Sequence, residues 1–170
     1  MTLAELNRLN LAAFVAELGA VFEHSPWVAE RAFQRRPFAT VEELHHVMTA
    51  VVRGATPAEQ LALVRAHPEL AGAEAKAGTM TAHSTGEQGR LGLTALSAGE
   101  FKRISEINRR YRAKFGFPCI VALKLHGSRE SVIDEMARRL DNAPHEELAR
   151  ALGQIGHITR ARLDQIVEAT

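Results

Sequence analysis

The stretch "TPAEQLALVRAHPEL", residues 56–70, contains the signals for both ends of one helix. Thr56 followed by Glu59 forms a capping box, and Pro57 stands at the first helical position, where its missing N–H costs nothing. At the other end His67 precedes Pro68, and a residue before proline is disfavoured in the helical region. The stretch predicts a helix that ends at His67 and aims an imidazole away from the helix body.

Helix signals of the same kind recur along the chain, whereas hairpin signals are nearly absent. The segment "VEELHHVMTAVVR" at 41–53, for example, is bracketed by a capping residue and a glycine. We expect an all-α fold, a compact bundle of about eight helices, with residues 1–170 forming a single domain. The other helices are predicted to begin near Thr2, Ser25, Thr40, Ser84, Ser97, Ser128 and Pro144.

Two segments interrupt the helical pattern. Residues 68–84 are rich in Gly and Ala and weakly periodic, which predicts a loop with room for one short helical turn. Residues 115–123, "FGFPCIVAL", are apolar but broken by glycine and proline, which predicts a buried extended loop that feeds a short helix. Buried irregular backbone needs hydrogen-bond partners, and a bound polar molecule is one source of them.

Composition narrows the class of protein. The chain has 170 residues, 46% hydrophobic and 24% charged, with a formal net charge of +1. These values are typical of a soluble globular domain and give no overall field for nucleic acid or anionic membrane. A single cysteine excludes an internal disulfide, no run of 18 apolar residues exists, and the N-terminus lacks a secretory pattern. We expect a cytoplasmic protein.

Several residues have both a chemical and a simpler interpretation. His67 is a candidate acid or base, or only an imidazole that caps the carbonyls of its helix. Ser84 with Glu87 matches a helix-opening capping box, whose exposed N–H groups can also hold an anionic or carbonyl oxygen. Arg162 lies beside the apolar face of the last predicted helix, where it reaches inward to a carboxylate or stays at the surface.

Other candidates favour structural roles. The basic cluster within residues 102–114 is best explained as a solvated helix face, so no nucleic-acid partner is expected. Cys119 lies in an apolar stretch without a neighbour that would lower its pKa, as expected for a buried, inert thiol. A metal site using His45, His46 and His83 is the alternative, but neither an HExxH motif nor paired Cys/His spacing supports it, and we expect no metal.

Five segments, taken together and in order, resemble the OHCU decarboxylase family, in which OHCU is 2-oxo-4-hydroxy-4-carboxy-5-ureidoimidazoline. Each segment is weakly specific alone, but the series is highly specific and covers nearly the whole chain. The segments are "HSPWVAERAFQRRPF" at 24–38, "LALVRAHPELAG" at 61–72, "STGEQGRLGL" at 84–93, "INRRYRAKFGFPCIVALKLHG" at 107–127 and "ALGQIGHITRARLDQIV" at 151–167.

The resemblance implies an all-helical enzyme without metal or organic cofactor. It implies release of CO2 from OHCU and stereoselective formation of (S)-allantoin on the route of urate degradation. The implied partner is a small ureide substrate, without nucleic acid or membrane, and relatives suggest a homodimer.

The resemblance also assigns residues. It implies that His67 and Glu87 are catalytic, and that Arg162, with Arg160 as a nearby competitor, contacts substrate. Cys119 departs from the family, which often carries phenylalanine or another bulky apolar residue there, and this change affects packing of the pocket. The remaining implied substrate contacts are Pro68, Ser84, Thr85, Gly86, Gln88, Cys119, Ile120, Val121, Ala122 and Leu123.

Two other classes of function remain open from the sequence. One is a helical binding module that keeps a ureide-sized pocket without catalysis; the intact His67, Glu87 and Arg162 argue against it. The other is a small hydrolase that uses the three histidines of the metal alternative.

Overall fold

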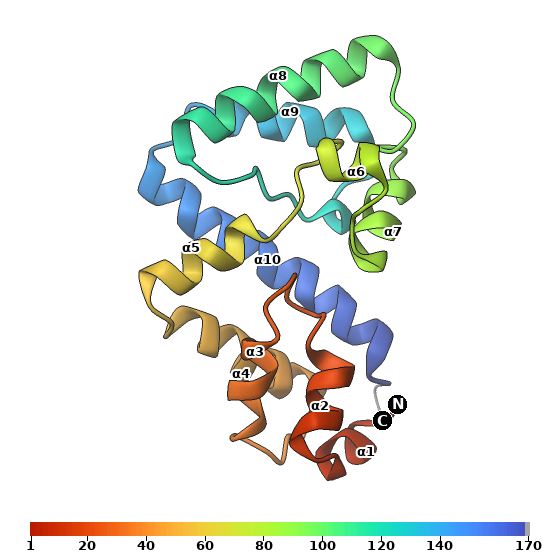
Figure 1. Cartoon of the computed structure of the whole chain (residues 1–170), viewed down its shortest axis with the longest axis vertical. Helices are drawn as coiled ribbons and strands as arrows, with labels where there is room; N and C mark the ends of the chain where they lie inside the picture. The colour runs from red at the N-terminus through yellow and green to blue at the C-terminus, as the bar shows by residue number, and fades with distance from the viewer. Residues whose placement is uncertain (169–170) are drawn as a thin grey trace. The chain divides into compact units, whose positions relative to one another are not determined.

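The computed structural model describes residues 1–168, and its secondary structure over this range is helical apart from one isolated bridge. The all-α prediction is confirmed, and eight of the ten α-helices have seven or more residues, close to the number expected. The elements are α1 (Leu3–Arg8), α2 (Leu11–Leu18), α3 (Trp27–Phe33), α4 (Val41–Arg53), α5 (Pro57–Arg65), α6 (Ala73–Ala77), α7 (Ala82–Arg90), α8 (Ala98–Phe115), the 3-10 helix η1 (Leu123–Leu125), α9 (Arg129–Arg139) and α10 (Pro144–Ile166) (Figure 1).

The chain divides into two compact units. The first contains Met1–Ala66 and the C-terminal residues from Ile158, and the second contains His67–His157. The single domain expected from the sequence stays a prediction. Among the described helices, none has the length and the hydrophobicity needed to cross a membrane.

Most predicted helix starts agree with the capping signals, but two differ, and α2, capped by Asn10, begins where no separate start is predicted. Capping boxes form at Thr2, Thr56 and Ser97, and Thr40 caps α4 as predicted. Ser25 was expected to cap α3, but the cap position is Pro26, because the Ser25 hydroxyl donates to the carbonyl of Glu23 instead.

The second exception is α7, which begins before the predicted start at Ser84. Its cap is Thr81, whose hydroxyl accepts a hydrogen bond from the Ser84 N–H. The 68–84 loop also contains the five-residue helix α6, which is the short helical turn that was anticipated.

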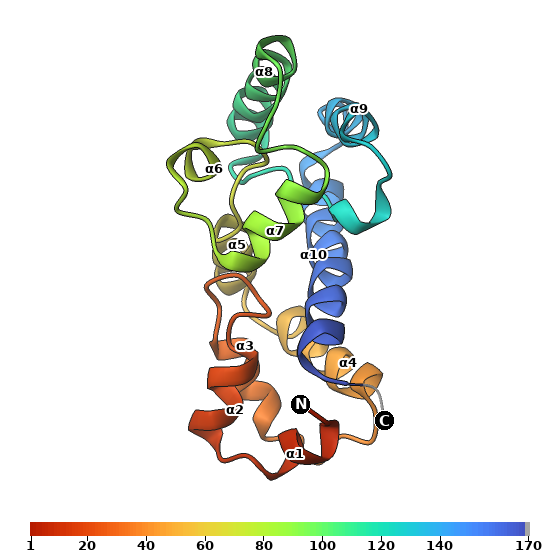
Figure 2. The ribbon, with the colours of Figure 1, turned by 90° about the vertical axis from the view of Figure 1, so that its right-hand side faces the viewer.

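The first unit has an aromatic core, and side-chain hydrogen bonds hold the backbone next to it. Phe14 is fully buried and meets Phe33 edge to face, with ring centroids 5.5 Å apart. Asn7 bonds the N–H and the carbonyl of Phe38, both at 2.9 Å. The two ends of the described chain also meet in this unit, because Glu168 N–H donates to the Met1 carbonyl at 2.8 Å (Figures 1 and 2).

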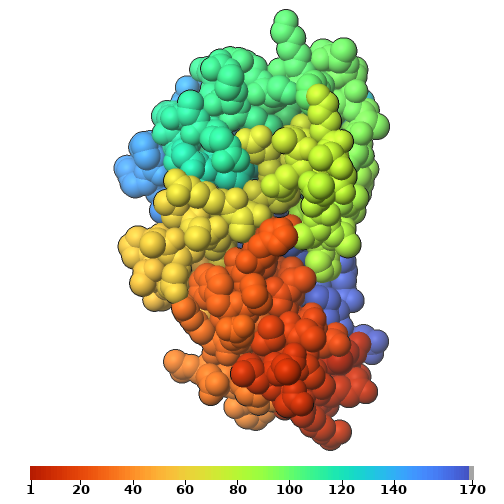
Figure 3. All heavy atoms as spheres, in the orientation of Figure 1, coloured from red at the N-terminus to blue at the C-terminus, as the bar shows by residue number. Residues whose placement is uncertain are grey.

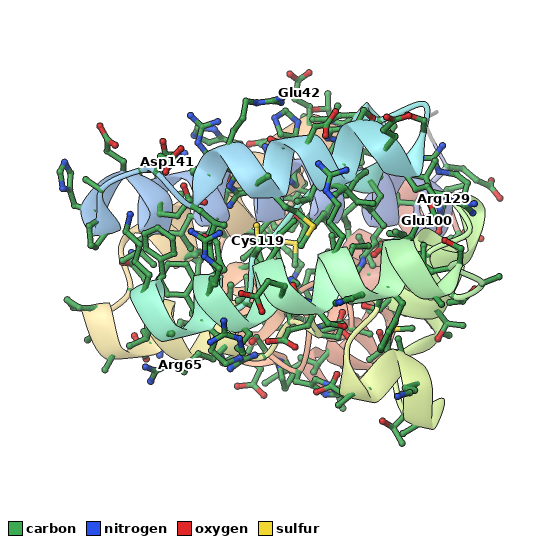
Figure 4. The ribbon with its side chains drawn as sticks, turned by 90° about the horizontal axis from the view of Figure 1, so that it is seen from above. Glu42, Arg65, Glu100, Cys119, Arg129 and Asp141 are labelled. Carbon is green, nitrogen blue, oxygen red and sulfur yellow. The ribbon has the colours of Figure 1, made fainter. Side chains whose placement is uncertain are left out.

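In the second unit α8 and α9 run parallel, side by side. Contacts between them follow their length, from Arg129 with Glu100 at the N-terminal ends to Lys114 with the Leu140 carbonyl at the C-terminal ends. Figure 4 looks down on this pair, with Glu100 and Arg129 together at one end and Cys119 between the two helices in projection.

A buried ion pair supports the irregular segment that follows α8. Arg139 pairs with Glu147, and both side chains are almost completely buried. The hydroxyl of Tyr111 donates to the same carboxylate at 2.7 Å, and Asn142 donates to its other oxygen at 2.9 Å. Arg139 also donates to the carbonyl of Ile120. The ion pair therefore connects α9 and α10 to the segment that the sequence predicts to be buried and extended.

Removing one partner of this pair leaves the other charged and buried. We expect Glu147→Ala to lower the free energy of unfolding by about 3–5 kcal/mol, because Arg139 is then uncompensated. The matched control is Asp134→Ala, which breaks an exposed pair with Arg103 and is expected to cost less than about 1 kcal/mol. Urea unfolding followed by circular dichroism measures both values. Equal, small losses in the two variants would contradict the structural role of the buried pair.

Candidate active site

His67 lies just beyond the end of a helix, close to where the sequence predicts. Helix α5 ends at Arg65 with Ala66 as its C-cap, and His67 follows in a bend. Both His67 and Pro68 are buried, as first residues of the second unit. The proline accounts for this geometry, because it turns the preceding residue out of the helical region.

Helix α7 places its candidate residues on different faces. Because Thr81 is the cap, Ser84 stands at the third helical position, and the interpretation of Ser84 and Glu87 as a capping box is wrong. Ser84 and Gln88, four residues apart, share the buried face, whereas Glu87 is half-buried and Thr85 and Gly86 are exposed. The α6–α7 segment, in yellow-green, forms part of the surface in Figure 3.

Gln88 joins α7 to the loop that begins at His67. Its Oε1 accepts a hydrogen bond from the N–H of Ala71 at 2.9 Å, and its Nε2 donates to the carbonyl of Glu69 at 3.3 Å. The same Nε2 contacts Met80 Sδ at 3.2 Å. The helix that carries Glu87 is thus bonded directly to the backbone two to four residues after the candidate imidazole.

A second side chain joins α7 to the segment 119–123. Arg90, at the end of α7, donates to the carbonyls of Leu123 and His126. Both ribbon views draw α7 next to η1, in agreement with these bonds (Figures 1 and 2). The second unit therefore brings together three predicted segments, which are the loop of His67, α7 and residues 119–123.

Three long side chains fix the backbone of residues 119–123, which are all buried. Arg139 holds the Ile120 carbonyl, Gln154 accepts the Ala122 N–H at 2.8 Å, and Arg90 holds the Leu123 carbonyl. None of these bonds uses the N–H or the carbonyl of Val121. The predicted buried, irregular segment is present, and these three side chains bond its backbone on either side of Val121.

Arg162 belongs to the first unit, where it is 1% exposed. Its Nη1 lies 2.8 Å from Glu23 Oε2 and 3.3 Å from the Val21 carbonyl oxygen. The alternative of a surface arginine is wrong. Arg160, by contrast, forms an i,i+4 pair with Asp164 that is more than a third exposed, so burial separates the two candidate arginines.

The histidines of the metal alternative do not form a ligand cluster. Over residues 1–168, no three His, Cys, Asp or Glu side chains gather as a metal site. His45, from α4, instead has its Nε2 at 3.0 Å from the Thr159 hydroxyl.

Sequence reasoning missed the side chains that hold these backbones. They include Arg90, Asn108, Arg139 and Gln154, each of which bonds a main-chain group at least 19 residues away. No local pattern marks them. The only hint was the buried irregular backbone itself, which requires partners from elsewhere in the chain.

A model of the OHCU decarboxylase family matches residues 7–164. The chain belongs to the OHCU decarboxylase family. The family recognised from the sequence segments is thereby confirmed, and the match begins near the end of α1 and ends within the last turn of α10.

Similar proteins agree with this family assignment. A 2-oxo-4-hydroxy-4-carboxy-5-ureidoimidazoline decarboxylase of Haloferax volcanii is 38% identical over 163 residues, which are 96% of this chain and 94% of that protein. A protein of the same name from Mus musculus is 35% identical over 99% of this chain and 94% of its own length. The crystal structure of an (S)-allantoin synthase superposes with a TM-score of 0.80 at 26% identity, over 99% of this chain and 55% of that one.

The buried thiol within this family segment gives a test of the local environment. Burial raises the pKa of Cys119 to about 12, whereas a cysteine in an unfolded chain titrates near pH ~8.5. The folded state therefore holds this proton more tightly. Its contribution to stability is complete below about pH 8.5 and is lost as the pH rises toward 12.

We expect the free energy of unfolding, measured in urea at pH 7 and pH 10.5, to fall more for the wild type than for Cys119→Ala. Burial also raises the pKa of Tyr111, so part of the alkaline loss remains in the variant. At pH 8 the native thiol should react slowly with a thiol reagent; immediate labelling of the folded protein would contradict the burial.

Proposed function

We propose that this chain catalyses the cofactor-independent decarboxylation of OHCU to (S)-allantoin in urate degradation, as a carboxy-lyase. The family assignment over residues 7–164 supports the reaction. One observation of the structure carries the assignment of the site: Gln88 and Arg90 bind α7, with Glu87, to the loop of His67 on one hand and to the 119–123 backbone on the other.

The chemistry requires a proton donor and an electron push. Loss of CO2 leaves an electron pair on carbon, which the adjacent imine-like ring system delocalises until a proton arrives on one face. His67 is proposed to deliver that proton, because imidazole donates and regains a proton near neutral pH. Glu87 is proposed to accept a hydrogen bond, or the proton, from the substrate hydroxyl and so to push electron density toward the breaking bond.

Binding is assigned to polar groups along the same elements. Ser84 and Gln88 on the buried face of α7, with the backbone of residues 119–123, are proposed to hold the ureido and ring amides. Gly86 is exposed, and a Cβ there would meet no atom within 4 Å. Pro68 and Thr85 complete the proposed contacts, and Arg162 is proposed to hold a negative or carbonyl oxygen.

A ureide-binding module without catalysis is the competing proposal. Such a module would bind the ureide without proton transfer. It therefore does not explain why the imidazole of His67 and the carboxylate of Glu87 lie on two elements that are bonded to each other. The two proposals differ in one observable, which is the chirality of the allantoin formed from fresh OHCU.

We further propose a cytoplasmic homodimer. A chain whose one thiol is buried and unpaired fits a reducing compartment. Light scattering of the purified protein tests the dimer, and a molar mass near 18.6 kDa would contradict it.

His67→Asn is expected to remove accelerated turnover while binding of allantoin persists. General acid–base catalysis contributes roughly a hundredfold to ten-thousandfold, so the variant should approach the spontaneous reaction, which gives racemic product. Time-resolved circular dichroism on freshly made OHCU measures rate and chirality together. His83→Asn, in the first turn of the same α7, is the matched control and should retain both. A fully active His67→Asn variant would sink the catalytic assignment.

Burial predicts which arginine contacts substrate. Arg162→Lys keeps the charge opposite Glu23 but loses the guanidinium fork, so we expect KM to rise by about tenfold or more, the value of one charge-assisted hydrogen bond. Arg160→Ala should leave KM nearly unchanged. Steady-state kinetics on both variants checks this, and an unchanged KM in Arg162→Lys with a lowered melting temperature would assign Arg162 to folding alone.

A further inference from the structure

Asn108 of α8 contacts the loop that follows the candidate catalytic histidine. Its side chain is 6% exposed, and its Nδ2 donates to the carbonyl of Leu70 at 2.9 Å. We propose that Asn108 is a positioning residue for His67, one that touches no substrate and acts through the backbone of residues 69–71. This inference rests on the proposed function of His67.

The loop is held at successive backbone groups by two different helices. Gln88 of α7 bonds the carbonyl of Glu69 and the N–H of Ala71, and Asn108 of α8 bonds the carbonyl between them. All three bonds come from neutral amides on regular helices, which are rigid supports. Without Asn108, the Leu70 carbonyl loses its buried donor, and α8 loses this bond to the loop backbone.

The conformation of this loop depends on such supports. Ala71 has a φ of 50°, in the left-handed region that residues with a Cβ avoid. Next to it, a Cβ at Gly72 would lie 2.6 Å from the Cβ of Glu69, so the turn is tight as well. Backbone of this kind persists only when its surroundings hold it. A relaxed turn at residues 69–72 would shift His67, which is joined to it through Pro68 alone.

A charged contact to the same loop is expected to matter less. Arg112, also on α8, bonds Glu69 Oε1 at 2.7 Å, but the two side chains are 49% and 23% exposed. Ion pairs that face water stabilise little, because solvent and salt screen them. Arg112→Ala therefore serves as a control that removes a contact to the loop but not its buried anchor.

The test replaces Asn108 by its closest isostere. Asn108→Asp keeps the volume, but an ionised carboxylate cannot donate to the Leu70 carbonyl. At pH 8 we expect kcat to fall by about tenfold to a hundredfold, as for a misplaced catalytic group, while KM changes less. The allantoin formed should lose part of its (S) excess, because protonation is no longer confined to one face.

The pH profile distinguishes positioning from general damage. Burial raises the pKa of a carboxyl group, and the protonated acid regains a donor for Leu70. The ratio of variant to wild-type kcat should therefore rise as the pH falls. A purely structural defect would leave this ratio and the chirality unchanged once rates are corrected for folded protein.

Asn7→Ala is the matched control for loss of a side-chain-to-loop bond. Asn7 bonds both backbone groups of Phe38, in a loop of the first unit without candidate site residues. This variant should lose stability but keep chirality and pH profile, as should Arg112→Ala. If Asn108→Asp does not fold, Asn108→Ser tests the same fall in kcat and loss of (S) excess, without the pH dependence, because its shorter side chain does not reach Leu70.

The outcomes separate two failures. An (S)-selective wild type with an equally fast and selective folded Asn108 variant overturns the positioning role and leaves the proposed function intact. A wild type that yields only racemic allantoin at the spontaneous rate overturns the proposed function, and the positioning role with it.

Discussion

The hydrogen bonds of one buried carboxamide connect the main parts of the candidate site. Gln88 presents an acceptor to the Ala71 N–H and a donor to the Glu69 carbonyl, so α7 and the loop of His67 are fixed with respect to each other. A neutral amide suits this task, because it satisfies both kinds of backbone group without the desolvation cost of a buried charge. The same helix then continues to Arg90, which reaches the 119–123 segment. Substitution at position 88 would therefore disturb the loop of His67 as well as the proposed contact of Gln88 with substrate.

Much of the candidate site consists of irregular backbone. This backbone explains why several buried polar side chains surround it, because its N–H and carbonyl groups need hydrogen-bond partners. Helices satisfy their own N–H and carbonyl groups, but a loop presents them to a ligand only if side chains satisfy the rest. In the second unit Asn108, Arg139 and Gln154 perform this task from three helices. The ion pair of Arg139 with Glu147 shows what it costs, because a buried guanidinium needs its own carboxylate, which in turn takes bonds from Tyr111 and Asn142.

Local chemistry explains why the sequence predicts most helix ends and some loops. Thr56, Ser97 and Pro68 act on neighbours within four residues, so their effects are visible in the sequence. The predicted start of α7 at Ser84 is wrong because two overlapping capping patterns compete, one from Thr81 to Ser84 and one from Ser84 to Glu87. The earlier start places Ser84 and Gln88 on the buried face, a tertiary advantage that no local motif records. The sequence does not predict side chains such as Asn108 that bond a distant part of the backbone, because no local pattern records them. The partner of Asn108, Leu70, lies 38 residues away.

The arrangement also explains why an imidazole on a loop suits a stereoselective reaction. A group that delivers a proton to one face must be held in place more strictly than a group that only accepts a hydrogen bond. His67 is the more buried of the two proposed catalysts, and its loop is bonded from α7 and α8. Glu87 is half-buried on a regular helix, where the helix itself gives enough order for an acceptor. Under the proposed function, the stricter demand falls on the loop of His67, whose backbone is bonded by Gln88 and Asn108, and we expect both the rate and the chirality of the product to depend on these bonds.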